Sequence, residues 1–340
     1  MAYLVGSERW SRRSFMHRLC GVAGLCAAAL LTGCQPPPQA PLVVGLGPWV
    51  GYDPFIVARE KGQVDGSRVK MVEVTTNAEA VRHFRNGLLD AAALTLDQVL
   101  QLASQGIDLR VVAVLSESSG ADVVMASPLV TSPDQLRGRP VLLEPSTVSA
   151  LMLRSLLQAG GLKSGEVAVV PMESSQHLAA MQAGRAVAAV SYEPLATQLR
   201  QAGFFALFDS RQMPGQILDV LVVRPDALTL RGGDVDELMR AWAFGLQAMQ
   251  ADRQATATWL APSLQMTADE YLETLNGLRF MTPADSLAYL AGSQAPLRQR
   301  GQMLATALVE LGEMAQEPPD LNRLIDTGPA GRTLQSRGQP

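Results

Sequence analysis

The chain has 340 residues, of which 47% are hydrophobic and 18% are charged, with a formal net charge of −4 at pH 7. A chain of this length can bury a sizeable core and usually divides into two domains or lobes. The acidic balance argues against a nucleic-acid partner. None of the three cysteines lies after Cys34, so the rest of the chain can form no disulfide and no cysteine metal cluster.

The first 33 residues are typical of a signal for export. A pair of arginines, Arg12-Arg13, precedes the uncharged run from Leu19 to Leu31, which is too short to span a bilayer. The run ends in Leu31-Thr32-Gly33-Cys34, which resembles the lipobox of bacterial lipoproteins, where the cysteine is acylated and becomes the mature N-terminus. We therefore expect residues 1–33 to be a lipoprotein signal peptide, with lipidation at Cys34. Its removal changes the net charge from −4 to −7, because it holds four arginines and one glutamate.

The export route and the anchor have alternatives. Ser11-Arg12-Arg13-Ser14-Phe15 also resembles a twin-arginine signal, and the sequence does not separate this route from general secretion. A buried helix or a membrane-spanning anchor is disfavoured by the short apolar run and the prolines after it. Residues 34–41 hold four prolines and predict a stiff tether. Lipoprotein maturation, by resemblance, adds three acyl chains, which would hold the protein on the periplasmic or cell-surface side of an inner or outer membrane.

Short apolar runs alternate with segments of helical period from residue 42 onward. We expect strands at 42–46, 69–74, 91–94, 110–115, 123–126, 140–143, 167–170, 186–191, 205–208 and 220–223. We expect helices at 54–61, 77–88, 97–104, 150–159, 176–183, 194–202, 235–249 and 303–314. The alternation predicts an α/β fold with parallel sheets covered on both faces. Most of the tail past Gly328 is expected to be disordered.

Five short patches follow one another in an order that one protein family shares. They read Pro48-Trp49-Val50-Gly51-Tyr52-Asp53-Pro54 with Ala58-Arg59-Glu60-Lys61-Gly62, then Gly87-Leu88-Leu89-Asp90-Ala91-Ala92, Gly106-Ile107-Asp108-Leu109-Arg110-Val111-Val112, Ser119-Gly120-Ala121-Asp122 and Ser191-Tyr192-Glu193-Pro194. Across residues 42–225 the chain resembles substrate-binding lipoproteins of the nitrate, sulfonate and taurine (thiamine-pyrimidine-precursor-like) class of ABC importers. The resemblance implies the α/β, two-lobe type II periplasmic-binding-protein fold, with mainly parallel sheets and a central cleft.

In this fold the chain builds one lobe, crosses to the other and returns. The implied boundaries are 42–127 with 220–314 for lobe one, 128–219 for lobe two and 315–340 for a C-terminal tail. Small ligands bind at the carboxyl ends of parallel strands, so we expect loops from both lobes to line the cleft. Closure of the lobes would bury the ligand, and the permease would recognise the closed monomer.

Six residues in these loops are our candidates for contact with the ligand. They are Trp49, Asp53, Thr95, Ser146, Thr147 and Glu193. Trp49 offers an aromatic face, and the two acidic residues offer carboxylates to a ligand cation. The hydroxyls of the other three lie at predicted helix starts, where unpaired N–H groups suit a ligand oxygen or anion. Core packing, helix capping and interaction with a helix dipole are the structural alternatives for these residues.

The charge of the predicted cleft loops distinguishes between ligand classes. The acidic residues in these loops are Asp53, Asp97, Asp122, Glu144, Glu193 and Asp219, and we place no arginine or lysine there. A site for a lone anion would more naturally carry a basic group. The loops therefore favour a ligand with a cationic or hydrogen-bond-donating end, such as an amine or amino-heterocycle. The alternative ligand class is a sulfonate or nitrate bound by helix N-termini. For Asp122 and Asp219, the alternative role is that of salt-bridge partners at the hinge.

An enzyme is the least favoured of the functional classes. A thiamine-precursor synthase resembles these proteins, but its cysteine-rich iron motif has no counterpart after Cys34. His83 and His177 lie in no catalytic or metal-ligand pattern. We therefore expect a lipid-anchored binding protein that delivers a small organic ligand to an ABC permease, with no cofactor, metal or nucleic acid. A ligand-sensing lipoprotein with a signalling partner would have the same sequence features.

Overall fold

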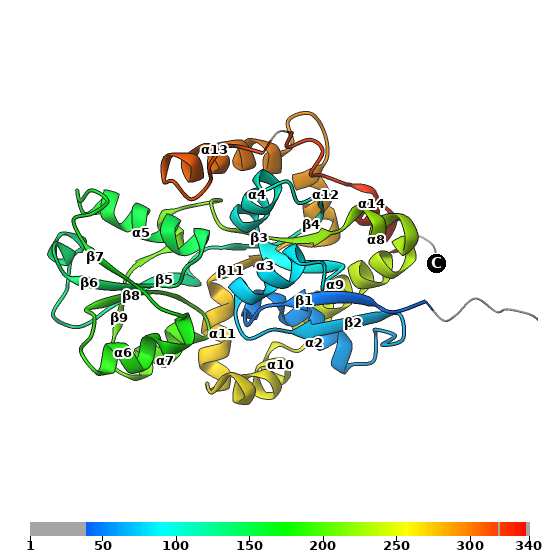
Figure 1. Cartoon of the computed structure of the whole chain (residues 1–340). Coiled ribbons are helices and arrows are strands. Elements are labelled where there is room, and N and C mark those ends of the chain that lie inside the picture. Colours follow the sequence, from blue (N-terminus) through cyan, green and yellow to red (C-terminus); the bar gives the residue numbers. More distant parts are fainter. Residues whose placement is uncertain (1–38, 319, 338–340) are drawn as a thin grey trace, which may run out of the picture. The chain divides into compact units, whose positions relative to one another are not determined.

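The computed structural model describes residues 39–318 and 320–337. The predicted signal peptide, Cys34 and most of the tether lie outside the described residues. The described part contains two β-sheets with helices packed around them (Figure 1). We call the part built on the six-stranded sheet lobe one and the part built on the five-stranded sheet lobe two. Among the described residues, no helix combines the length and apolar character needed to cross a membrane.

Lobe one contains a mixed sheet with the strand order β11-β4-β10-β3-β1-β2. Its strands are β1 (Leu42–Leu46), β2 (Val69–Glu73), β3 (Ala91–Thr95), β4 (Arg110–Ser118), β10 (Leu218–Val223) and β11 (Leu278–Phe280). β1 pairs in parallel with β2 and β3, whereas β10 runs antiparallel to β3 and β4. This register places Asp219 of β10 beside Thr95 on one side and Ser116 on the other. Three polar residues from distant parts of the chain thus become neighbours.

Lobe two contains a second mixed sheet, with the order β7-β6-β8-β5-β9. Its strands are β5 (Asp122–Ala126), β6 (Pro140–Leu143), β7 (Ala168–Pro171), β8 (Ala188–Tyr192) and β9 (Phe205–Asp209). β6 pairs in parallel with β7 and β8, and β5 runs antiparallel to β8 and β9. The first pair of that antiparallel ladder is Asp122 opposite Tyr192.

The prediction of mainly parallel sheets is wrong, because the chain passes between the two sheets twice. β4 leads out of lobe one and β10 leads back in, so these neighbouring strands run in opposite directions. In lobe two, β5 enters the sheet and β9 leads out of it, and these two strands are antiparallel neighbours. The ten expected strands are all present, and β11 is an additional one.

Helices surround the two sheets. They are α2 (Asp53–Glu60), α3 (Asn77–Arg85), α4 (Leu96–Ser104), α5 (Thr147–Ala159), α6 (His177–Gln182), α7 (Leu195–Gln201), α8 (Pro225–Leu230), α9 (Gly232–Ala251), α10 (Arg253–Leu260), α11 (Ala268–Asn276), α12 (Pro283–Leu290), α13 (Pro296–Glu310) and α14 (Gly328–Arg337). Phe55 of α2 packs on Trp242 of α9, with ring centroids 4.9 Å apart. Near this contact a Cβ on Gly245 would lie 1.8 Å from the carbonyl oxygen of Pro54, so the close approach of the two helices requires glycine.

The chain after Gly328 forms a helix, so the prediction of a disordered tail is wrong. α14 packs against α9 and α12, and its Ala330 is fully buried. Arg332 of α14 forms an ion pair with Asp236 of α9 at 2.8 Å. Just before α14, Ile325 forms a parallel bridge with Val111 of β4. The residues that pack this helix against its neighbours are small. They give little apolar periodicity, which is the signal by which a helix is predicted from sequence.

Candidate ligand-binding site

Two sets of polar and aromatic side chains meet where the lobes adjoin. The lobe-one set comes from the segments that follow β1 and β3 and from the start of β10. The lobe-two set comes from the segments that follow β6 and β8 and from the start of β5. The rings of Trp49 and Tyr192 meet in a T-shaped contact, with centroids 6.0 Å apart and planes at 73°. Between the same lobes, the buried hydroxyl of Thr147 on α5 donates a hydrogen bond to Asp97 on α4.

Asp219 is the best-connected carboxylate of the lobe-one set. It accepts hydrogen bonds from Trp49 Nε1 at 2.9 Å, from the Tyr52 hydroxyl at 3.2 Å and from the Ser116 hydroxyl at 2.5 Å. Burial raises the pKa of Asp219 to about 6, although these three hydrogen bonds act to lower it. All three partners are neutral, so Asp219 is held by a hydrogen-bond network rather than by the salt bridge considered from the sequence.

Lobe two contributes buried acceptors without partners. Oδ2 of Asp122, Oε1 of Glu144 and Oγ of Ser191 are buried and have no hydrogen-bond partner among the described residues. Burial raises the pKa of Asp122 to about 7, and the nearby carboxylates of Asp219 and Asp97 act in the same direction. The pKa of Glu144 is also raised to about 7, first by burial and then by a neighbouring carboxylate.

The acidic groups at this junction have no basic partner. Within the described residues, no ion pair involves Asp97, Asp122, Glu144 or Asp219. Burying a carboxylate without a cation is costly, and the raised pKa values express that cost. The arrangement can therefore accept a buried cation or a strong hydrogen-bond donor.

Thr95 and Ser146 occupy helix starts on the two sides of this junction. Thr95 is the N-cap of α4, and its N–H donates to Gln98 Oε1 at 3.2 Å. Ser146 is the N-cap of α5, and its hydroxyl accepts from the N–H of Ser149 at 3.4 Å. Ser146 therefore caps its helix as the structural alternative predicts, whereas the buried Oγ1 of Thr95 has no hydrogen-bond partner among the described residues. Thr147 follows Ser146 with its hydroxyl on Asp97.

The carboxylates of Asp53 and Glu193 are occupied by other protein groups. The Tyr271 hydroxyl donates to Asp53 at 2.7 Å, and burial raises the pKa of Asp53 to about 7. Glu193 accepts from the N–H and hydroxyl of Thr197 at 3.0 and 2.8 Å and pairs with Arg200 at 2.5 Å. These contacts favour structural roles, since they hold α2 against α11 and fix the start of α7.

The junction brings together several residues that the sequence patterns do not single out. The six candidates from the sequence include none of Asp122, Asp219, Tyr52 and Tyr192. Tyr192 is the last residue of β8 and pairs with Asp122 of β5, whereas Glu193 lies beyond the strand. The pairing of β10 with β3 and β4 had no signal in the sequence.

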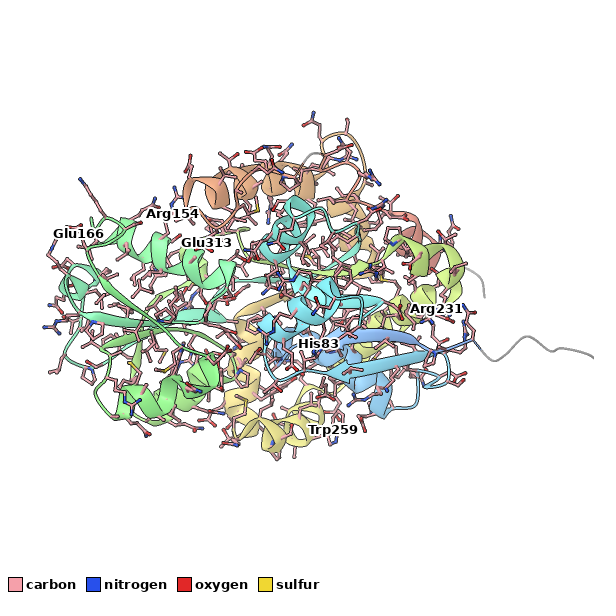
Figure 2. All side chains as sticks on the ribbon, in the orientation of Figure 1. His83, Arg154, Glu166, Arg231, Trp259 and Glu313 are labelled. Atoms are coloured by element: carbon pink, nitrogen blue, oxygen red, sulfur yellow. The ribbon has the colours of Figure 1, made fainter. Side chains whose placement is uncertain are left out.

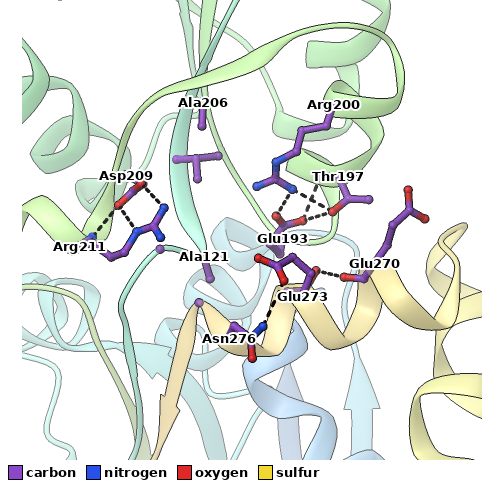
Figure 3. A pocket seen from close by; sticks show the side chains of 14 residues that line it. Ala121, Glu193, Thr197, Arg200, Ala206, Asp209, Arg211, Glu270, Glu273 and Asn276 are labelled. Carbon is purple, nitrogen blue, oxygen red and sulfur yellow. Dashed lines mark hydrogen bonds and ion pairs between the residues drawn. The ribbon is translucent and has the colours of Figure 1, made fainter. Parts of the chain in front are cut away.

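A cavity of about 370 Å³ lies at another part of the lobe boundary, lined by residues of α7, α11 and the segment around β9. Figure 3 shows that its charged side chains largely meet each other: Glu193 contacts Arg200, and Arg211 contacts Asp209 at 2.7 Å. Glu273 of α11 accepts from Asn276 Nδ2 at 3.1 Å. Because most charges here are already paired, this cavity is a weaker candidate for a ligand than the junction.

The histidines of the described part have local partners. Nε2 of His177 lies 3.0 Å from the carbonyl oxygen of Met172, and the residue is buried. His83 on α3 lies 3.7 Å from Glu79 on the same helix (Figure 2). No group of three or more histidine, cysteine, aspartate or glutamate side chains in the described residues could hold a metal ion.

Comparisons with known proteins place the chain in a family. The model of the NMT1-like family matches residues 35–261. The chain belongs to the NMT1-like family. The taurine-binding periplasmic protein of Escherichia coli (strain K12) is 26% identical to this NMT1-like protein over 165 residues, which are 47% of this chain and 51% of the relative. The match therefore spans about half of the relative's length.

Solved structures confirm the fold of this NMT1-like protein. The alkanesulfonate-binding protein SsuA from Xanthomonas axonopodis pv. citri, bound to MOPS, has a TM-score of 0.71 and 16% identity, covering 86% of this chain and 98% of SsuA. The desulfurization enzyme DszB has a TM-score of 0.63 and 16% identity, covering 88% and 100%. The predicted two-lobe periplasmic-binding-protein fold is confirmed, and so is the family resemblance that the five patches indicate. Because the sequence identities are this low, the structural likeness is evidence for the fold alone.

Proposed function

We propose that this NMT1-like protein is a lipid-anchored, extracytoplasmic solute-binding protein of an ABC importer. It binds a small organic ligand with a cationic or hydrogen-bond-donating end, such as an amine or amino-heterocycle, where its lobes adjoin. It works as a monomer, without a cofactor, and passes the ligand to the permease. Family membership and the periplasmic relative support the class of protein.

The observation that carries the ligand proposal is the pair of unpartnered buried oxygens, Asp122 Oδ2 and Glu144 Oε1. A ligand N–H group placed at either oxygen satisfies a buried acceptor, and a cationic group also relieves the cost of ionising that carboxyl. Trp49 and Tyr192 meet at the same junction and supply aromatic faces that attract cations. Thr95, Ser146 and Thr147 complete the proposed contacts, and Asp53 and Glu193 position the surrounding helices.

A ligand of sulfonate type is the second candidate. The relatives include a taurine-binding protein and an alkanesulfonate-binding protein, and α5 begins at the junction with Ser146 and Thr147. An anion bound only at this helix start would leave the oxygens of Asp122 and Glu144 without partners. For this reason the amine class is the main proposal.

A thermal-shift screen tests the proposal. Mature protein is heated with amines, aminopyrimidines, alkanesulfonates and nitrate, and a bound ligand raises the melting temperature through mass action. We expect amines or aminopyrimidines to give the largest shifts in wild type and none in Asp122→Asn. Shifts from sulfonate or nitrate alone, equal in both proteins, would contradict the cationic ligand.

Two further measurements separate the class of protein from its alternatives. Incubation of the protein with a hit from the screen should give stoichiometric binding and no product, whereas product formation would indicate an enzyme, as in the structural neighbour DszB. Cys34→Ala should abolish incorporation of labelled lipid and release the protein from membranes. Unchanged membrane attachment in that variant would contradict the proposed anchor.

A further inference from the structure

One end of the lobe-one sheet brings three segments of the chain together around Asp90. The Asp90 carboxylate accepts from the N–H of Val43 in β1 at 2.8 Å and from Arg231, directly after α8, at 3.0 Å. The backbone carbonyl of Asp90 accepts from the N–H of Arg224, which follows β10, at 2.9 Å. Arg231 is labelled in Figure 2, near the point where the described chain begins. We call this part of the molecule the Asp90 end of lobe one.

Two large apolar side chains are exposed at the Asp90 end. Leu88 lies in the turn after α3, two positions before Asp90, and is 62% exposed. Leu230 is the last residue of α8, directly before Arg231, and is 72% exposed. Only six large apolar side chains are exposed in the described part of the chain, and these are two of them. Exposed apolar side chains that gather in one place mark an interaction surface, whereas single ones do not.

The Asp90 end lies at the opposite end of the strands from the ligand junction. Leu88 precedes β3 and Leu230 follows β10, whereas the junction is formed by residues after β3 and at the start of β10. The two strands are antiparallel neighbours, with Val223 beside Ala91, so the start of β3 lies next to the end of β10. A partner on the Asp90 end therefore leaves the junction uncovered.

The chain enters the described structure at this same end. β1 begins at Leu42, and the next residue, Val43, is the one that donates to Asp90. Cys34 lies eight positions before Leu42, and eight residues span at most about 28 Å when fully extended. A lipid group on Cys34 would therefore keep the Asp90 end within reach of the membrane surface, whatever path the intervening residues take.

The carboxylates on the segments that form the Asp90 end each face an arginine. These pairs are Asp90 with Arg231 at 3.0 Å, Asp234 with Arg68 at 2.7 Å and Asp226 with Arg224 at 4.0 Å. The negative charges of this end are thus offset locally, which reduces repulsion from anionic lipid headgroups. Apolar side chains on a charge-balanced surface suit the headgroup region of a membrane, where leucines are withdrawn from water.

We propose that the Asp90 end of lobe one docks on the membrane that holds the lipid anchor, with Leu88 and Leu230 inserted among the lipid headgroups. Lipid is the occupant because the short tether brings this end of the molecule to the membrane. The docked protein turns its ligand junction toward the solution that supplies the ligand, so delivery to the permease requires it to leave this position. The inference rests on the lipid anchor of the proposed function.

Fluorescent labelling of single cysteines in the lipidated protein tests the inference. In the proposed mature form Cys34 is acylated and no cysteine follows it, so an engineered cysteine carries the label alone. The labelled variants are Leu88→Cys, Leu230→Cys and the control Leu129→Cys, a leucine of lobe two that is 79% exposed. Each is placed in vesicles of phosphatidylethanolamine and phosphatidylglycerol that contain a nitroxide lipid as quencher. We expect quenching at least about threefold stronger at the two lobe-one positions than at the control, because docked side chains enter the headgroup region.

A second set of variants separates insertion of the leucines from mere proximity to the membrane. The label is placed on Asn86→Cys, an exposed position in the turn beside Leu88. Adding Leu88→Ser and Leu230→Ser should remove at least about half of the quenching of this label, whereas adding Leu129→Ser should leave it unchanged. All three leucines are exposed, so the melting temperatures of these variants should match and exclude a folding defect.

The outcomes separate this inference from the proposed function. Equal quenching at all three labelled leucine positions in vesicle-bound protein overturns the docking surface and leaves the anchor intact. Protein that is not acylated at Cys34 and stays off the vesicles overturns the anchor and this inference with it. Protection that grows with the number of protein molecules per vesicle indicates a second copy, and protection in native membranes but not in vesicles indicates a protein partner. Either result overturns lipid as the occupant.

Discussion

Two buried carboxylates of lobe one differ from two of lobe two in their hydrogen-bond partners. In lobe one, Asp53 and Asp219 are held by hydroxyl and indole donors of the protein itself. In lobe two, Asp122 and Glu144 each have a buried oxygen without a partner among the described residues. Buried polar atoms in folded proteins are nearly always hydrogen-bonded, so the exceptions call for an explanation. The difference indicates that Asp53 and Asp219 serve the fold, whereas Asp122 and Glu144 await a donor that the ligand supplies. Glu193 of lobe two is occupied by Thr197 and Arg200 and belongs with the structural carboxylates.

The substitution Asp122→Asn should have the largest effect on binding. Removing one partner of a buried charge pair costs about 2–5 kcal/mol, so affinity for an amine hit should fall by a factor on the order of 100. The apo protein should keep or gain stability, because the amide removes a buried carboxylate that lacks a cation. Calorimetric titration and thermal melting measure the two effects.

Asp53→Asn is the matched control for that comparison. Asp53 is equally buried and its pKa is also raised to about 7, but the Tyr271 hydroxyl occupies its carboxylate. Affinity for the amine should therefore change by less than about twofold. A loss of affinity as large as that of Asp122→Asn would erase the distinction between the two lobes.

The stability of the ligand-free protein should fall as pH rises from about 5 to 8. The pKa values of Asp53, Asp122 and Glu144 in the folded protein are about 7, above the value of about 4 for unfolded carboxyls. In this window the folded state binds more protons, so raising the pH favours unfolding. We expect the free energy of unfolding to fall by at least about 2 kcal/mol, as measured by denaturant titration across pH.

A bound amine should reverse part of this pH dependence. A cation beside Asp122 lowers the pKa of that carboxyl, so amine affinity should rise as pH increases through about 7. In Asp122→Asn, both the stability of the free protein and the affinity for the amine should depend less on pH. Affinity that is constant between pH 5 and about 8 in wild type would mean that no buried carboxyl of this kind contacts the ligand.

Tyr271→Phe should lower stability without affecting binding. The change leaves the buried carboxyl of Asp53 without its hydroxyl donor, which costs about 1–3 kcal/mol. Denaturant unfolding should report this loss, while amine affinity stays within about twofold. An unchanged free energy of unfolding would show that the hydrogen bond in lobe one is not a structural one.

The smallest effect is expected at a surface contact between the lobes. Arg154 of α5 (labelled in Figure 2) donates to Glu310 of α13 at 2.9 Å and to the carbonyl oxygen of Ala307 at 3.2 Å. Exposed ion pairs contribute about 0.2–1 kcal/mol, so Arg154→Gln should weaken amine binding by less than about fivefold. The control is Arg185→Gln, an exposed arginine of lobe two, which should have no effect. Equal affinities of the two variants would show that the Arg154 contact does not contribute to amine binding.

The sequence predicted where strands and helices lie along the chain better than which of them pack side by side. The apolar runs predicted β1 to β10, because each run alone is long enough to form a strand. The antiparallel entry of β10 beside β3, which brings Asp219 to Thr95, depends on a crossing between lobes and leaves no local signal. α14 was not predicted for a related reason. Its small residues give little apolar periodicity, and the helix is stabilised by its packing against α9.

The candidate site was predictable in part. The rule that ligands bind after parallel strands led to Trp49, Thr95 and the Ser146-Thr147 pair, all of which lie near the lobe junction. The same rule could not reveal that Tyr271, distant in the chain, occupies Asp53. It also could not reveal that Arg82 and Arg85 of α3 line one cavity with Ser146 and Thr147 at the start of α5, because only the tertiary structure brings these residues together.

The most direct measurement is a crystal structure of the mature protein with the tightest-binding amine of the thermal-shift screen. We predict a ligand nitrogen within about 3 Å of Asp122 Oδ2 or Glu144 Oε1, enclosed by residues of both lobes. A ligand seated elsewhere, or one that places a sulfonate or an apolar group against these two oxygens, would contradict the account.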